Sequence, residues 1–139
     1  YEYRILNEEF PDPLERLYSH FTYVPLDVEK MREAGKHLIG EHDFKSFCSI
    51  HTQAETTVRT VTELDVERQG KVIVTGTGFL YNMVRIIAGT LMAAGSGKIA
   101  PGQVKDILAA CDRGAAGPTA PARGLTLAAY RFEEEIPVI

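Results

Sequence analysis

The sequence has 139 residues, of which 45% are hydrophobic and 24% charged, so neither a disordered nor a fibrous protein is expected. This length is usual for one domain, and no apolar run approaches the roughly 20 residues of a membrane-spanning helix. The two cysteines, Cys48 and Cys111, show no CxxC or histidine spacing, which excludes a zinc framework and favours a reducing, cytoplasmic setting.

Charge is distributed unevenly along the chain. The formal net charge is −4, which alone argues against binding to nucleic acid. Residues 1–70 carry 8 basic and 14 acidic side chains, whereas residues 71–132 carry 7 basic and 2 acidic ones. A basic C-terminal half can face phosphate groups, although uneven sampling of surface charge explains the same numbers.

The first expected element is a strand over residues 1–6, where aromatic and charged side chains alternate. A turn-rich loop follows, and residues 14–23 show no clear period. Asp27 is a good N-cap for a helix over residues 28–39, whose apolar side chains recur at spacings of three and four. Residues 42–47 are expected to be irregular.

A β-hairpin is predicted over residues 59–78, because two segments of alternating polarity flank the pair Gln69-Gly70. The apolar spacing then predicts a helix over residues 80–94. Pro101, a residue favoured in the first turn, begins another helix.

The chain continues through a loop rich in Gly, Ala and Pro over residues 114–123 to a last strand over residues 125–132. Because hairpin strands are antiparallel, this order predicts a single α+β domain. We expect a mostly antiparallel sheet with helices packed on one face. No metal is expected, since the histidines show no ligand spacing: His20, His37, His42 and His51.

Arg85 lies next to the apolar stripe of the predicted helix over residues 80–94. An unpaired buried charge is very costly, so a buried guanidinium needs a partner. No acid stands three or four positions away, where the sequence has Tyr81, Asn82, Ala88 and Gly89. Arg85 is therefore expected either to pair with a distant residue or a ligand, or to extend from the helix edge into solvent.

Several blocks of the sequence resemble the bacterial tRNA pseudouridine synthase A family, and they occur in the family's order. Residues 78–91 resemble the signature F-x-x-x-M-V-R-x-I-x-G-x-L, whose arginine is Arg85. The other matching blocks are residues 40–47 (G-x-x-D-F-x-S-F), residues 59–61 (R-x-hydrophobic), residues 112–125 (D-R-x-x-A-x-x-T-A-x-A-x-G-L), and Tyr1, Tyr3 and Ile5 (Y-x-Y-x-I). The resemblance covers nearly the whole chain.

This resemblance implies the C-terminal half of a pseudouridine synthase fold. The family isomerises uridine to pseudouridine at positions 38 to 40 of the tRNA anticodon stem-loop, with no metal or organic cofactor. Its catalytic aspartate lies in a G-R-T-D-A-G-V-H-A stretch, which these 139 residues do not contain. The chain is therefore expected to be the C-terminal domain of a longer enzyme and to be inactive alone.

Three residues take site roles from the resemblance. Tyr1 matches the tyrosine that stacks on the flipped uracil and is a candidate base for the final proton. Arg85 matches the arginine that pairs with the catalytic aspartate and keeps it ionised. Leu125 matches a leucine that lies against that tyrosine and the uracil. Without the resemblance, Tyr1 is a ring at a sheet edge and Leu125 is an ordinary core residue.

The expected partner is the tRNA anticodon stem-loop, and the family acts as a homodimer whose tRNA crosses both subunits. Four basic residues are candidates for phosphate contacts by position and charge alone: Lys45, Arg59, Lys98 and Arg123. Two other functions stay open. One is a catalytically inert RNA-binding or dimerisation module, and the other is a small-molecule enzyme on an α+β scaffold.

Overall fold

The computed structural model describes residues 1–8, 10, 12–49, 55–68 and 70–128. Five strands form a sheet in the order β2-β1-β5-β4-β3, and β6 also pairs with β1, on the side away from β5. All neighbours are antiparallel except β1 and β2, which are parallel. The strands are β1 (Glu2–Asn7), β2 (His20–Thr22), β3 (Gly40–Asp43), β4 (Val58–Glu67), β5 (Lys71–Gly76) and β6 (Leu125–Thr126).

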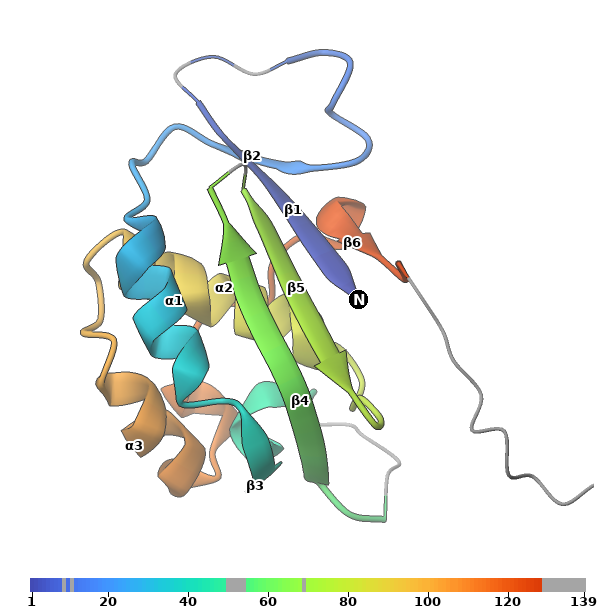
Figure 1. The fold of residues 1–139 in the computed structure, drawn as a ribbon, viewed down its shortest axis with the longest axis vertical. Helices are drawn as coiled ribbons and strands as arrows, with labels where there is room; N and C mark the ends of the chain where they lie inside the picture. Colours follow the sequence, from blue (N-terminus) through green and yellow to red (C-terminus); the bar gives the residue numbers. More distant parts are fainter. Residues whose placement is uncertain (9, 11, 50–54, 69, 129–139) are drawn as a thin grey trace, which may run out of the picture.

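The three α-helices lie on one side of this sheet (Figure 1). They are α1 (Val28–Lys36), α2 (Met83–Gly95) and α3 (Gln103–Ala110). The strands explain this arrangement, because their side chains alternate between the two faces. Tyr3 and Val72 are register partners and are buried on the helical side. Their neighbours Arg4 and Lys71 are also partners and lie on the open face. The expected α+β class with a mostly antiparallel sheet is confirmed.

Helix α2 is the centre of the core. Most of its 13 residues are buried, including Met83, Ile87 and Leu91, which are fully so. A helix that is apolar on nearly every side is stable only when it is surrounded by other elements. The sheet lies against it on one side, and α1 and the segment after α3 lie against the others.

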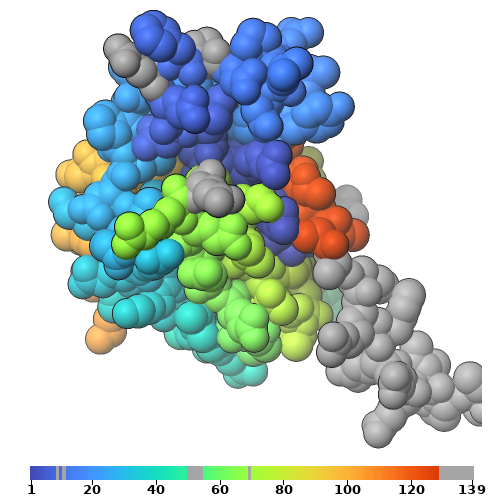
Figure 2. Space-filling model, turned by 45° about the horizontal axis from the view of Figure 1, so that its top comes forward, coloured from blue at the N-terminus to red at the C-terminus, as the bar shows by residue number. Residues whose placement is uncertain are grey.

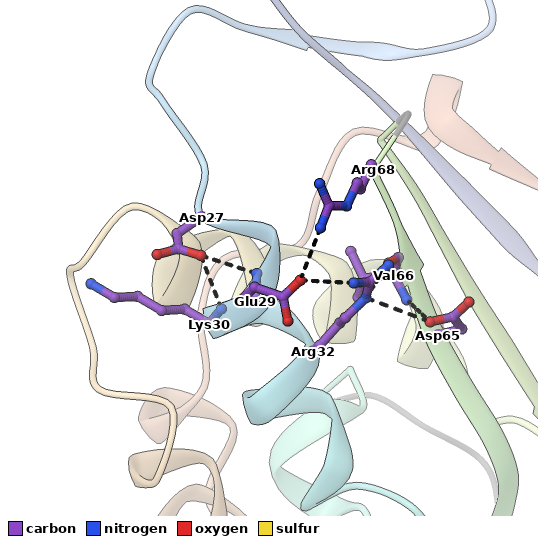
Figure 3. Close-up of polar contacts among 7 residues, drawn as sticks. All are labelled: Asp27, Glu29, Lys30, Arg32, Asp65, Val66 and Arg68. Atoms are coloured by element: carbon purple, nitrogen blue, oxygen red, sulfur yellow. Dashed lines mark hydrogen bonds and ion pairs between the residues drawn. The ribbon is translucent and has the colours of Figure 1, made fainter.

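Helix α1 is fixed at both its start and its polar edge (Figure 3). The carboxylate of Asp27 accepts from the backbone N–H groups of Glu29 at 3.0 Å and Lys30 at 3.2 Å, as predicted for an N-cap. Arg32 donates through Nε to the carbonyl oxygen of Val66 in β4 at 2.8 Å and through Nη1 to Glu29 at 2.9 Å. These contacts hold α1 to the part of β4 that is not paired with β3.

The predicted hairpin is confirmed, with Gly70 at a φ of +88° in its turn, while Gln69 lies outside the described residues. The prediction of an irregular segment over residues 42–47 was wrong for residues 42 and 43. They end strand β3, where His42 is the register partner of Arg59. Strand β2 was not predicted, because its three residues form a parallel pair with β1 across a long loop.

Several boundaries differ from the predicted ones. Helix α3 begins at Gln103, so Pro101 precedes the helix instead of standing in its first turn. Helix α1 ends at Lys36 rather than residue 39, and α2 begins at Met83 rather than residue 80 because Asn82 has left-handed backbone angles. The last strand was predicted too long, since β6 ends at Thr126. Residues 129–132 of that prediction lie outside the described part of the chain.

Candidate active site

Three segments meet at one end of the sheet: the start of β1, the start of α2, and residues 112–125. In Figure 2 the red part of the chain, which contains β6, lies against the dark blue residues of β1. The β1–β6 pairing places Leu125 opposite Tyr3, two residues from Tyr1. The backbone N–H of Ala120 donates to the carbonyl oxygen of Arg85 at 3.1 Å. Tyr1, Arg85 and Leu125, which are far apart in the sequence, thus belong to adjoining segments.

Tyr1 is held at the end of β1 by backbone and side-chain contacts. Its backbone N donates to the carbonyl oxygen of Val74 at 3.0 Å, and the N–H of Val74 donates back at 2.9 Å. The half-buried ring of Tyr1 meets the ring of Phe79 edge to face, with the centroids 5.2 Å apart. These contacts fix the position of the ring and leave part of it accessible.

Tyr3, for which the sequence analysis predicted no site role, is fully buried at the centre of this region. Its hydroxyl donates to the carbonyl oxygen of Pro121 at 2.6 Å, and Gly124 lies directly on its ring. A Cβ atom at position 124 would be 2.7 Å from Cζ of Tyr3. Burial raises the pKa of the Tyr3 phenol, and the nearby charges of Arg85 and Arg123 offset this only in part. Tyr3 therefore stays neutral and acts as a structural residue.

Arg85 is half-buried and is bonded to two neutral acceptors. Its Nε donates to the carbonyl oxygen of Ala120 at 2.7 Å, and its Nη1 donates to Oδ1 of Asn82 at 3.0 Å. Of the expected alternatives, pairing with a distant residue is the one observed, through Ala120, and no acid stands three or four positions away. Asn82, three positions before Arg85, is a second and local partner that the search for acids did not consider. A neutral amide is an acceptor just as a carboxylate is. No acid of the described residues forms an ion pair with Arg85.

Residues 112–121 pack closely against α2 and are also held by hydrogen bonds within the segment. Nη1 of Arg113 donates to the carbonyl oxygen of Gly117 at 2.8 Å, and its Nη2 donates to Oγ1 of Thr119 at 3.1 Å. The N–H of Gly117 donates to Oγ1 of Thr90 at 3.0 Å. At Gly89 of α2, a Cβ atom would be 1.8 Å from the carbonyl oxygen of Pro118, so only glycine fits there. This packing fixes the carbonyl group that holds Arg85.

The four basic candidates are not equally placed. Arg123 is exposed in the turn before β6. Its charge is close enough to Tyr3 and His20 to lower the pKa of each. Arg59 of β4 is half-buried, and its side chain lies beside Gly78, the first residue of the signature block over residues 78–91. Lys45 is exposed beside Asp43. Lys98 follows the far end of α2, about 20 Å along the helix from the Arg85 end, so it lies away from this region.

Comparison with known proteins identifies the chain. The family described as tRNA pseudouridine synthase matches residues 34–133, which include Arg85, Ala120 and Leu125. The chain belongs to the tRNA pseudouridine synthase family. It is 54% identical over 131 residues to tRNA pseudouridine synthase A of Bacillus subtilis, a match that covers 91% of this chain and 53% of the relative.

Two further relatives have the same name and nearly the same coverage. Identity is 53% over 130 residues to the enzyme of Brevibacillus brevis and 45% over 130 residues to that of Acetivibrio thermocellus. Each match covers 91% of this chain and 53% of the relative. The chain thus spans about half the length of the curated relatives it matches.

The described part of this tRNA pseudouridine synthase family member contains no cluster of three or more His, Cys, Asp or Glu side chains suited to a metal ion. His51, one of the four histidines considered in the sequence, lies outside that part. Among the described helices none is long and apolar enough to cross a membrane.

Proposed function

We propose that the protein to which these residues belong isomerises uridine to pseudouridine in tRNA, and that this chain supplies the arginine, tyrosine and leucine of its active site. The main support for this proposal is the environment of the Arg85 side chain. Its guanidinium is half-buried in the family's signature block, and its two bonds within the described residues go to neutral acceptors. A positive charge in such a place is suited to receive a carboxylate.

The proposed reaction breaks the N-glycosidic bond of a flipped uridine, rotates the uracil, and rejoins it to the sugar through carbon. The nucleophilic aspartate comes from outside these 139 residues. Arg85 pairs with it through the N–H groups that Ala120 and Asn82 leave free, which keeps the carboxylate ionised and oriented. No metal or organic cofactor takes part in this scheme.

Tyr1 and Leu125 are proposed to hold the uracil. The support for Tyr1 is its partly accessible ring, which Phe79 and the bonds to Val74 keep in one position. A phenol offers a flat face for stacking and a polar tip for proton transfer. Leu125 is half-buried at the start of β6, next to the turn that carries Arg123. It is proposed to lie against both Tyr1 and the uracil.

The substrate is proposed to be the anticodon stem-loop of tRNA, modified at positions 38 to 40 in the cytoplasm. Arg59 and Arg123 are the best-placed candidates for phosphate contacts, because both lie at the end of the sheet that carries Arg85. Lys45 and Lys98 are weaker candidates by their positions. A homodimer, in which one tRNA crosses both subunits, would join two such basic surfaces.

The test is the release of tritium from tRNA labelled with [5-³H]uridine. We expect release by the full-length polypeptide that contains this chain, and none by the 139-residue chain alone. Release by neither would overturn the proposal and favour an RNA-binding module without activity. In that case the affinity for an anticodon stem-loop should fall steeply as salt is raised.

A further inference from the structure

We infer that Asn82 is a positioning residue that aims the guanidinium of Arg85 at the catalytic carboxylate. This inference rests on the proposed function. The geometry that points to it is found at the start of α2. There Asn82 has a positive φ, and its side chain bonds to Arg85 and Ser49.

The side chain of Asn82 connects Arg85 with a second block of the sequence. Its Oδ1 accepts from Nη1 of Arg85 at 3.0 Å, and its Nδ2 donates to Oγ of Ser49 at 2.9 Å. The orientation of the amide follows from its neighbours, because a guanidinium only donates and must therefore face the amide oxygen. Both ends of the amide are engaged, so it cannot rotate away from Arg85 without losing two hydrogen bonds.

A comparison of the starts of α1 and α2, two of the three α-helices, shows that Asn82 does not cap its helix. Asp27 precedes α1 with extended backbone angles, and its carboxylate caps two N–H groups of the first turn. Asn82 precedes α2, yet its side chain makes no capping bond and its φ is +61°. Asparagine is among the preferred capping residues and one of the few that tolerate this left-handed region. At this position the amide faces Arg85 instead of the helix.

Asn82 and Ala120 together fix the plane of the guanidinium. Ala120 accepts from Nε and Asn82 from Nη1, so two different nitrogen atoms are held. One bond alone would leave the planar group free to turn about it. With both bonds the remaining N–H groups are presented in a defined direction, and a carboxylate can bind them without reorganisation.

The test uses the full-length polypeptide and compares Asn82→Gly with the wild type. Glycine adopts a positive φ without strain, so the backbone turn is retained while the acceptor for Arg85 is removed. We expect kcat for pseudouridine formation to fall about 10- to 100-fold, as displaced catalytic groups usually cause, with KM for tRNA changed less than about twofold. The melting temperature should fall only modestly, because the loss of two side-chain hydrogen bonds is partly offset by the ease with which glycine adopts a positive φ.

A matched control is Cys111→Gly. Cys111 is the other non-glycine residue with a positive φ among the described residues, at 46°, and it follows α3 rather than α2. This variant also replaces a residue of positive φ by glycine, but at a position away from Arg85. Its kcat should therefore match that of the wild type. If Asn82→Gly also matches the wild type, Asn82 serves only the turn and the inference is wrong.

Asn82→Asp gives a second readout that a purely structural role would not change. The added carboxylate would pair with Arg85 and lie near the nucleophile, which raises the pKa of the nucleophilic carboxyl group. We expect the acidic limb of the kcat–pH profile to move to higher pH. An unmoved limb would overturn the inference even if Asn82→Gly failed to fold. If the wild type makes no pseudouridine, the proposed function itself is wrong, and the role of Asn82 is withdrawn with it.

Discussion

Arg85 and Ala120 exchange two hydrogen bonds, although they are 35 positions apart in the chain. The guanidinium of Arg85 donates to the carbonyl oxygen of Ala120, and the N–H of Ala120 donates to the carbonyl oxygen of Arg85. Two blocks of the family's sequence pattern, one in α2 and one before β6, are thereby fastened together. The position of the charged group therefore depends on both blocks.

Arg85→Ala in the full-length polypeptide should abolish turnover and largely spare tRNA affinity. The guanidinium is proposed to act on the nucleophile and not on the phosphate backbone, so its loss affects the chemical step. We expect single-turnover tritium release to fall at least about 100-fold, the usual loss when one preorganised charge-stabilising donor is removed. Filter binding should give a Kd for tRNA close to the wild-type value.

The control for this prediction is Arg16→Ala. Arg16 is exposed in the loop between β1 and β2, so this variant removes the same charge elsewhere on the molecule. Turnover should be unaffected by it. Near-normal turnover by Arg85→Ala would contradict the proposed pairing with the aspartate.

Tyr1→Phe should still permit the uracil to stack and should slow the completion of the reaction, because only the phenolic hydroxyl is lost. The measurement is single-turnover formation of pseudouridine by the full-length polypeptide. An unchanged rate would exclude the phenol from the chemistry. Tyr3→Phe makes a useful contrast, since it removes a buried hydrogen bond to Pro121 and should instead lower stability by about 1–2 kcal/mol.

Gly89→Ala should destabilise the fold, contrary to the usual effect of this exchange inside a helix. Alanine is favoured over glycine by about 1 kcal/mol in a helix interior. At Gly89, however, the new Cβ would be 1.8 Å from the carbonyl oxygen of Pro118, a backbone atom that can move only with its whole segment. Overpacking of this kind costs about 1–3 kcal/mol, so the clash should outweigh the gain in helix propensity.

Urea denaturation of the 139-residue chain tests this balance, with Gly102→Ala as the matched exchange. Gly102 has ordinary helical angles, and a Cβ there would meet nothing within 4 Å. Because Gly102 is the N-cap of α3, where alanine is less favourable than glycine, this exchange should change the stability by no more than about 0.5 kcal/mol. If Gly89→Ala lowered the stability no more than Gly102→Ala does, residues 112–121 would not be packed tightly against α2.

The stability of the domain should fall as the pH is lowered from 7 towards 5, in part through His20. Burial, and then the nearby charge of Arg123, lower the pKa of His20 in the folded state below its usual 6.5. Below about pH 6.5, His20 therefore binds a proton more readily in the unfolded chain than in the folded one, and this difference favours unfolding. His20→Gln should make the midpoint of urea denaturation less dependent on pH over this range. Arg123→Gln should do so to a smaller extent, and an unchanged dependence in His20→Gln would exclude this group.

Much of the fold could be predicted from the sequence, because its main elements are long and periodic. The hairpin and the three helices follow from apolar spacing, turn residues and the cap at Asp27. Strand β2 could not be found in this way, since three residues carry no period and their parallel partner is set by a distant segment. The early end of the β6 pairing likewise depends on contacts that local sequence does not contain.

For the site, the residues were easier to predict than their contacts. Arg85 was singled out because its helix offered no acid, and that reasoning overlooked a neutral amide three positions away. The left-handed angles of Asn82 leave no clear mark in the sequence. The glycine inside α2 was the best available signal for the close approach of residues 112–121, because a glycine in a helix interior is unfavourable unless another backbone lies against it.

The irregular segment from Asp112 to Ala120 is bonded as firmly as a strand, and its hydrogen exchange should reveal this. The N–H of Asp112 donates to the buried hydroxyl of Ser46, that of Gly117 to Thr90, and that of Ala120 to Arg85. Ser46 in turn donates to the carbonyl oxygen of Ile107 in the last turn of α3. These amides should exchange with solvent deuterium about as slowly as those in α2. The segment that carries the site would then open only when the core of the domain opens.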